Sequence, residues 1–278
     1  MIKTSTQLKA KVRNLSGGDN NKAKMLIRNF IMERFLERIA LSEYRNNFIL
    51  KGGMLVAAVV GLETRATMDI DSTVRSLPLS EEKAREIVEE IIRVEIDDGV
   101  SFSITKVSDI MEGHDYPGIR FMLEATLDKL RQAIKIDIST GDVITPGAIE
   151  YSYKLMFEDR SISIWTYNLE TMLGEKLETI MARETANTRM RDFYDIHVLP
   201  WREGVDTAVF NAAFMATSRK RETTEMISRL DDILAAIRNE SIMKEMWDKY
   251  RRDNFFVGDI SWEDVNKSVL ELRNVLQD

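Results

Sequence analysis

Two aspartates stand one residue apart in the stretch KGGMLVAAVVGLETRATMDIDSTV, which runs from Lys51 to Val74. The residues around them are apolar enough for a buried β-strand, in which Asp69 and Asp71 would point from one face, roughly 6 to 7 Å apart. Two carboxylates so close repel each other, and a divalent cation between them relieves that repulsion. Mg²⁺ fits, because it binds one or two protein carboxylates together with waters and substrate phosphates.

A glycine pair and a third aspartate extend the pattern. Gly52 and Gly53 fall between a short strand and a short apolar helix, where backbone N–H groups can approach a phosphate and the helix start favours an anion. Asp137 alternates with isoleucines in IKIDI, so it lies on the face opposite to theirs. Alone, a glycine pair is usually a turn and D-x-D is common. In this order, the three features predict metal-assisted phosphoryl transfer, with Asp137 as a third metal ligand.

A second group of charges stands in the C-terminal part of the chain. Lys176 lies at the edge of the apolar stripe in NLETMLGEKLETIMAR. Its stem could simply cover the helix surface, or its ammonium could reach a triphosphate in a cleft. Asp192 and Asp195 share one face of the next predicted helix, close to Arg189 and Arg191. They could lock the helix by ion pairs, orient Lys176, or contact an acceptor, and the sequence leaves these alternatives open.

The elements that would position these residues divide the chain near residue 167. We expect a mixed α/β domain over residues 1–167, with a long amphipathic helix near residues 23–39. Residues 168–278 carry apolar residues at helical spacing and predict a helical C-terminal domain. The fold class is therefore α/β (α+β) with a mixed sheet and a helical lobe. The predicted strands are Phe48–Lys51, Arg65–Val74, Val100–Val107, Tyr116–Leu127, Ala133–Ser139 and Ser161–Tyr167, and residues 146–159 are expected to be irregular.

Composition excludes several classes of function. The 278 residues include no cysteine and only two histidines, His114 and His197, which excludes disulfide scaffolds and thiolate sites and argues against a histidine-rich metal site. The net charge of −7 argues against a strongly basic nucleic-acid binder, although basic clusters such as Arg219-Lys220-Arg221 could act locally. The chain starts without the apolar segment of a signal peptide, and its longest apolar run, residues 54–62, is too short to cross a bilayer. We therefore expect a cytoplasmic protein with no membrane association.

The ordered motifs resemble those of the nucleotidyltransferase superfamily, and more specifically of the AbiEii toxin family. That family typically shows KGG, then R-x-T-x-D-[IL]-D, a strand ending in GD, EK on a helix, and R-D-[FY]-x-D-[IL]. The corresponding segments of this chain are Lys51-Gly52-Gly53, Arg65-Ala66-Thr67-Met68-Asp69-Ile70-Asp71, Ile136-Asp137-Ile138 through Gly141-Asp142, Glu175-Lys176, and Arg191-Asp192-Phe193-Tyr194-Asp195-Ile196. Together they cover about residues 48 to 200.

The resemblance implies a nucleotidyltransferase-like core, a helical lobe, and nucleotidyl transfer from a nucleoside triphosphate (GTP or CTP among the candidates) with Mg²⁺. It also implies a tRNA 3′ end as acceptor and a cognate antitoxin as partner. The residues expected to be catalytic are Asp69, Asp71, Asp137, Lys176, Asp192 and Asp195. Those expected to bind the nucleotide are Lys51, Gly52, Gly53, Arg65, Thr67 and Lys176, and those expected to bind the metal are Asp69, Asp71 and Asp137.

Two alternatives stay open at this point. The chain could be a nucleotidyltransferase that modifies a protein or a small molecule, or a GTP-binding module that acts through its partner. The presence of all three aspartates argues against a module that has lost its activity. The helices beyond about residue 200 carry no recognised motif, so the sequence does not select the nucleotide, the acceptor or the oligomeric state.

Overall fold

The computed structural model describes residues 1–77, 80–110 and 118–276, and the chain divides into two compact units. The first unit comprises Met1–Ala58, Ala66–Asp142 and Ile149–Thr166, and the second comprises Val59–Arg65, Val143–Ala148 and Tyr167–Asp278. The second unit thus takes up two short segments from earlier in the chain, and the domain boundary at residue 167 stays a prediction. His114 and the first residues of the strand expected at Tyr116 lie outside the described residues.

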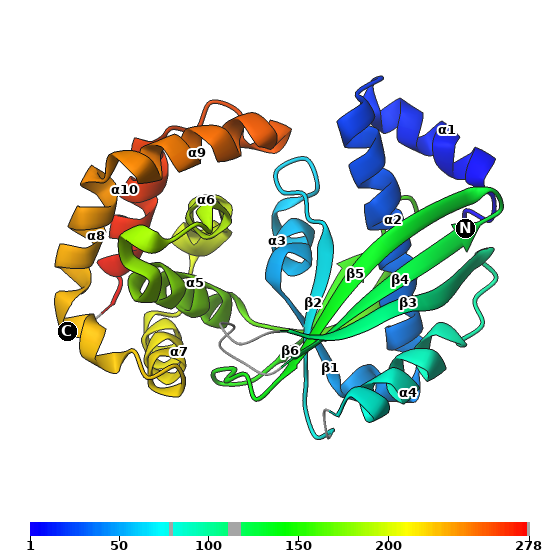
Figure 1. Ribbon diagram of the computed structural model, residues 1–278, viewed down its shortest axis with the longest axis horizontal. Coiled ribbons are helices and arrows are strands. Elements are labelled where there is room, and N and C mark those ends of the chain that lie inside the picture. The colour runs from blue at the N-terminus through cyan, green and yellow to red at the C-terminus, as the bar shows by residue number, and fades with distance from the viewer. Residues whose placement is uncertain (78–79, 111–117, 277–278) are drawn as a thin grey trace. The chain divides into compact units, whose positions relative to one another are not determined.

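A mixed seven-stranded sheet forms the centre of the first unit, in the order β3-β4-β5-β2-β1-β7-β6 (Figure 1). The pairs β2–β5 and β1–β7 are parallel, and the other neighbours are antiparallel. This confirms the expected α/β class with a mixed sheet. The strands are β1 (Phe48–Lys51), β2 (Asp69–Val74), β3 (Val100–Ile110), β4 (Gly118–Leu127), β5 (Leu130–Thr140), β6 (Ile149–Lys154) and β7 (Ser161–Thr166).

Two strands differ from the expectation. Strand β2 begins at Asp69 rather than Arg65, because the Arg65 N–H donates to the Gly61 carbonyl (3.0 Å) in a turn that precedes it. Strand β6 lies within the stretch expected to be irregular, and it pairs with β7 at the edge of the sheet. The β6 segment IEYSYK does alternate apolar or aromatic residues with polar ones, a strand signal that the sequence-based expectation overlooked.

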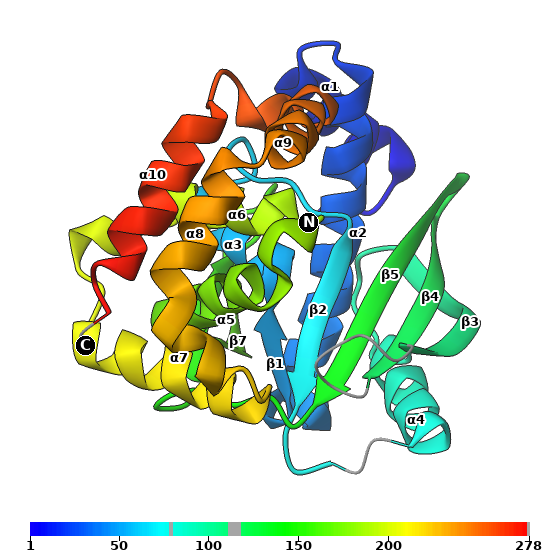
Figure 2. The ribbon, with the colours of Figure 1, turned by 60° about the vertical axis from the view of Figure 1, so that its left-hand side comes forward.

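One face of this sheet is apolar and is covered by helix α2 (Asn20–Leu41; Figure 2). Phe121, Ile136 and Ile70 lie in register on β4, β5 and β2, and all three are fully buried. The Phe35 ring of α2 packs edge-on against Phe102 of β3, with 5.9 Å between the ring centroids. The other helical segments of this unit are α1 (Ser5–Ser16), η1 (Glu43–Asn46), α3 (Gly52–Val60) and α4 (Glu81–Ile92).

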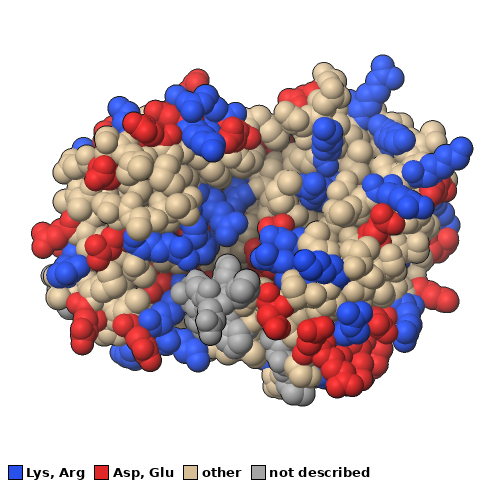
Figure 3. Space-filling view, in the orientation of Figure 1, with Lys and Arg blue, Asp and Glu red and all other residues tan. Residues whose placement is uncertain are grey.

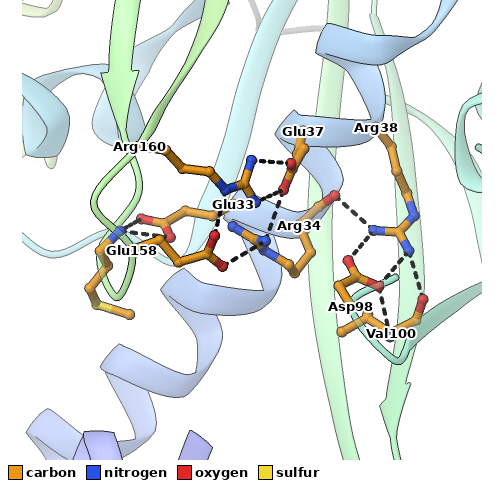
Figure 4. Close-up of polar contacts among 9 residues, drawn as sticks. Glu33, Arg34, Glu37, Arg38, Asp98, Val100, Glu158 and Arg160 are labelled. Atoms are coloured by element: carbon orange, nitrogen blue, oxygen red, sulfur yellow. Dashed lines mark hydrogen bonds and ion pairs between the residues drawn. The ribbon is translucent and has the colours of Figure 1, made fainter. Parts of the chain in front are cut away.

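Helix α2 also buries charged side chains, which hold two loops of the first unit (Figure 4). Arg38 donates to both carboxylate oxygens of Asp98 (2.8 and 3.1 Å) and to the Val100 carbonyl (2.7 Å). Glu37 forms ion pairs with Arg34 on the helix and with Arg160, the residue that directly precedes β7. The network thus ties α2 to the start of β3 and to the β6–β7 hairpin.

The second unit is helical, as the sequence predicts. Its helices pack closely where residues are small: a Cβ at Gly174 of α5 would lie 3.0 Å from the backbone nitrogen of Phe214 in α7. In the part of the chain that the structure describes, no helix combines the length and the apolar character that a membrane crossing needs. The helical segments are α5 (Leu169–Arg183), η2 (Glu184–Ala186), α6 (Met190–Val198), η3 (Pro200–Glu203), α7 (Thr207–Lys220), η4 (Thr224–Arg229), α8 (Leu230–Asn239), α9 (Ser241–Asp253), η5 (Phe255–Val257) and α10 (Trp262–Arg273).

Candidate active site

A row of four charged side chains crosses the polar face of the sheet in the first unit. Asp71 of β2 is in register with Lys51 of β1 on one side and with Asp137 of β5 on the other, and Asp137 is in register with Arg120 of β4. Residues in register on neighbouring strands point from the same face. The strand pairing therefore brings Asp137 beside Asp71, and Asp69 joins them two residues earlier on β2.

Gly52 is the residue that leaves room for Asp71. It follows β1, opens α3 and has φ of +67°, a left-handed conformation that glycine adopts without steric cost. A Cβ at this position would lie 2.2 Å from Oδ2 of Asp71 and 2.8 Å from its Cβ and Cγ. Gly53 is the second residue of α3. The backbone at the start of α3 thus approaches the carboxylate pair directly, as a site for a metal-bound phosphate requires.

Two basic side chains contact the aspartates of this row. Arg120 makes a bidentate contact with Asp137: Nε donates to Oδ1 and Nη2 donates to Oδ2, both at 2.8 Å. The hydrogen bonds to Asp137 raise the pKa of Arg120 above its ordinary value, and the charges of Asp69 and Asp71 add to the effect. Lys135 lies in register with Asp69, and its Nζ is 2.6 Å from Asp69 Oδ2 and 3.9 Å from Asp137 Oδ2.

Lys51 has a buried partner of its own. Its ammonium forms an ion pair with Asp142, whose side chain is fully buried just after β5. The Ser139 hydroxyl donates to the same carboxylate (3.1 Å). Asp142 therefore fixes the side chain at the end of β1, immediately before the Gly52 turn. Thr67, on the approach to β2, donates its hydroxyl to the Asp69 carbonyl (3.4 Å).

The donor set fits a metal ion that is shared with substrate, rather than one enclosed by protein alone. Among the described residues, no three histidine, aspartate or glutamate side chains converge on a position that would hold a metal ion by themselves. Mg²⁺ does not need such a cage, because it commonly takes one or two carboxylates and completes its shell with waters and phosphates. Asp69 and Asp71, on one face of β2 and beside the Gly52 turn, supply those two carboxylates.

In the second unit, Lys176 of α5 is held by two aspartates of α6. Its Nζ lies 2.5 Å from Asp195 Oδ2 and 3.3 Å from Asp192 Oδ1. Arg65 donates from Nε to Asp195 Oδ1 (2.6 Å), and Arg189 Nε lies 2.8 Å from Asp192 Oδ2. Both carboxylates are only 1% exposed, and Lys176 is 11% exposed. The five side chains form one buried ion-pair cluster.

The electrostatics of this cluster keep both carboxylates ionised. Burial alone would raise the pKa of Asp195, but Arg65 and Lys176 outweigh burial and lower it to about 2. The pKa of Asp192 is also lowered, because Lys176 and Arg189 outweigh its burial. The guanidinium of Arg65 also lies over the Phe256 ring, 5.8 Å from its centroid. These aspartates act as fixed anions, so the geometry supports orientation of Lys176 rather than proton transfer.

Sequence reasoning assigned no role to three residues of these sites, Arg120, Lys135 and Asp142, although Asp142 stands in the Gly141-Asp142 motif. The structure does bring Asp69, Asp71, Asp137 and Gly52 together, and separately brings Lys176, Asp192, Asp195 and Arg65 together. Lys135 was detectable in principle, since it stands two residues before Asp137 and so shares its face. Arg120 was not, because only the β4–β5 register places it opposite Asp137.

The sequence model of the nucleotidyl transferase AbiEii toxin family, from type IV toxin–antitoxin systems, matches residues 34–267. The chain belongs to this family. The expected resemblance is thus confirmed: this AbiEii-family protein is a nucleotidyltransferase of the toxin class, and a type IV toxin–antitoxin family implies an antitoxin partner. No curated protein sequence matches the chain.

Solved structures confirm the nucleotidyltransferase-like fold. MenT4, a nucleotidyltransferase toxin from Mycobacterium tuberculosis, aligns with a TM-score of 0.58 and 15% identity over 95% of this chain and 99% of that chain. JHP933 from Helicobacter pylori aligns with a TM-score of 0.52 and 16% identity over 90% of this chain and 89% of that chain. At these identities the likeness concerns the fold alone.

Proposed function

We propose that this toxin transfers a nucleotide from a nucleoside triphosphate to the 3′ hydroxyl of an RNA, with the tRNA 3′ end as the favoured acceptor. The observation that carries the proposal is the packing of Gly52 against Asp71, which places a helix start beside paired carboxylates. In the reaction, the 3′ oxygen attacks the α-phosphorus, the bond to the pyrophosphate breaks so that pyrophosphate leaves, and the hydroxyl proton passes to solvent water. Mg²⁺, when bound, would neutralise the phosphate charge that develops during this displacement.

The residues of the first unit have distinct proposed roles. Asp69 and Asp71 hold the metal ion against the triphosphate. Asp137, which is in register with Asp71, is the third carboxylate on this face of the sheet. From β5 it would face the acceptor hydroxyl. The backbone of Gly52 and Gly53 would cradle the phosphates, since N–H groups at a helix start favour an anion. Lys51 would contribute positive charge at the same turn, and Thr67 would support the start of β2 through the Asp69 carbonyl.

In the second unit, the role proposed for Lys176 is the phosphate contact that the family resemblance implies, because a fixed ammonium stabilises negative charge on a phosphate. Asp192 and Asp195 position Lys176, and Arg65 completes that arrangement through Asp195. The lowered pKa values of both aspartates support this role, since both carboxylates stay anionic at neutral pH.

The net charge of −7 is compatible with an RNA acceptor, because the acidic side chains are unevenly distributed. Figure 3 shows acidic residues gathered over the region of α4. That helix carries Glu81, Glu82, Glu86 and Glu90, all exposed. A protein with one strongly acidic helix on its surface can still present local positive charge to phosphates elsewhere.

Incubation of the purified protein with total RNA, Mg²⁺ and each labelled nucleoside triphosphate in turn tests the proposal. We expect label on small RNA, from one preferred nucleotide, and a loss of more than a hundredfold for Asp71→Asn. Label on protein or on a small molecule would contradict the RNA acceptor while preserving the enzyme class. Transfer by Asp71→Asn at the wild-type rate would contradict the role of the carboxylate pair.

A further inference from the structure

The three aspartates on the polar face of the sheet are already accompanied by cations that belong to the chain. Asp69, Asp71 and Asp137 carry three negative charges. Lys135 contacts Asp69 and Asp137, and Arg120 contacts Asp137, so these five side chains together carry a net charge of −1. A divalent ion that approaches this face does not meet three uncompensated carboxylates. It must compete with side chains that occupy them.

The two basic residues hold their partners differently. Arg120 makes two parallel hydrogen bonds that use both oxygens of Asp137, a rigid fork that fixes that side chain. Lys135 makes a point contact: its Nζ lies 2.6 Å from Asp69 and 3.9 Å from Asp137, on neighbouring strands. The Lys135 ammonium thus occupies an oxygen of Asp69, one of the two carboxylates proposed to bind the metal, and its flexible four-carbon stem lets it leave without breaking the Arg120–Asp137 hydrogen bonds.

We propose that Lys135 is the resident counter-ion of the Asp69–Asp71 site and that the divalent metal binds by displacing its ammonium. This rests on the proposed metal role of the two aspartates. Lys135 is 26% exposed and Asp69 is 23% exposed, so solvent reaches the pair and the exchange needs no opening of the core. Metal binding is then an exchange of one cation for another, and Lys135 sets its affinity.

The exchange has two physical consequences. In the metal-free protein, Lys135 relieves the repulsion among carboxylates that lie on adjacent strands, so it stabilises the site before any substrate arrives. It also weakens binding of a free divalent ion, because the ammonium must first lose its contact with Asp69. A metal that arrives with a triphosphate has an advantage, since the phosphates offer the displaced ammonium new acceptors.

Titration of metal-free protein with Mn²⁺, followed by calorimetry, tests this without any measurement of transfer. We expect Lys135→Met to bind Mn²⁺ at least tenfold more tightly than wild type, and Lys135→Arg, which keeps the charge, to bind no more tightly than wild type. Lys106→Met, on β3 of the same sheet, removes the same charge from an exposed position outside this row and should change the affinity less than twofold. Equal or weaker Mn²⁺ binding by Lys135→Met would overturn the proposal.

Thermal unfolding supplies a second reading. In EDTA, Lys135→Met should unfold at a lower temperature than wild type, and saturating Mn²⁺ should remove that difference. A difference that persists unchanged in Mn²⁺ would show an ordinary structural ion pair and would overturn the proposal. Asp71→Asn distinguishes a failure of the proposed metal site from a failure of the Lys135 exchange. If neither wild type nor Lys135→Met binds Mn²⁺ any better than Asp71→Asn, the metal role of the aspartates is contradicted, and this inference is contradicted with it.

Discussion

The two charged clusters use the same residue types but differ in burial and in how many contacts each charge makes. On the sheet of the first unit, Asp69 is 23% exposed and contacts Lys135 through one oxygen. In the second unit, Asp195 is 1% exposed and is held by Arg65 and Lys176 through both oxygens. The first carboxylate can exchange its partner for another cation in contact with water. The second is fixed, because removal of either partner would leave a buried charge uncompensated.

This difference separates carboxylates that can exchange a cationic partner from carboxylates that are fixed by theirs. A half-exposed pair contributes little to stability, since water competes for both charges and the side chains lose freedom to form it. A buried, multiply bonded cluster contributes mainly by keeping one arrangement of its members. Mutations in the two clusters should therefore separate stability from activity.

Asp195→Asn should show the largest effect on stability. It leaves Arg65 and Lys176 buried with too little negative charge, which costs about 3 to 5 kcal/mol in comparable sites. Asp69→Asn should lower the free energy of unfolding by less than about 1 kcal/mol, because its ion pair is solvated. Yet we expect Asp69→Asn to lose more than a hundredfold in nucleotide transfer. Urea unfolding and the transfer assay measure the two quantities on the same proteins.

Arg93→Gln provides the control for that comparison, because Arg93 forms an exposed ion pair with Glu89 on α4. It should change neither stability nor transfer appreciably. Similar losses of stability from Asp195→Asn and Asp69→Asn would contradict the distinction between a buried cluster and an exchangeable row.

Glu33 of α2 sharpens the comparison, because it is buried like Asp195 but its pKa moves in the opposite direction. Burial raises the pKa of Glu33 to about 8, although the backbone N–H of Met156 and the amide of Asn29 donate to its carboxylate (3.1 and 2.9 Å). Asp195 has two cations in direct contact, whereas these closest donors to Glu33 are neutral. Contact with cations, not burial by itself, therefore decides which buried acid stays ionised.

Glu33→Gln should accordingly stabilise the protein at alkaline pH. In wild type, the folded state holds the Glu33 proton between the ordinary pKa of 4.5 and about 8, so stability falls as pH rises through this window. Glutamine keeps an acceptor for the Met156 N–H without the charge. We expect the variant to gain about 2 kcal/mol over wild type at pH 9, and to be within about 1 kcal/mol of it at pH 5, by urea unfolding. A pH-independent difference would contradict the raised pKa.

The sequence shows which residues lie on the polar face of the sheet. It does not show which residues of neighbouring strands lie beside them. Period-two alternation indicates that Asp69 and Asp71 share a face and that Asp137 opposes its isoleucines. That Arg120 faces Asp137 follows only from the pairing of β4 with β5. The register depends on contacts between distant parts of the chain, which local periodicity does not encode.

Burial of charge was the other feature that the sequence concealed. The apolar positions of α2 predicted a long amphipathic helix, and the helix spans Asn20–Leu41. However, Glu33, Arg34, Glu37 and Arg38 are all buried (Figure 4). Charged residues are seldom fully buried unless they are paired, so the helical pattern predicts that they are exposed. That prediction is wrong where residues from elsewhere in the fold pair with them.

Gly52→Ala should have a clear effect on activity, and Gly61→Ala is its control for the backbone cost of a left-handed alanine. Both glycines have positive φ, +67° and +90°, so each substitution should cost about 1 to 2 kcal/mol for a left-handed alanine. Among the residues that the structure describes, no atom lies within 4 Å of a Cβ added at Gly61, whereas at Gly52 it would meet Asp71. We therefore expect Gly52→Ala to lose more free energy of unfolding than Gly61→Ala, and we expect a loss of transfer and of Mn²⁺ affinity of more than tenfold for Gly52→Ala alone. Equal activity in both variants would show that the position of Asp71 does not depend on Gly52, and would remove the observation on which the proposed site rests.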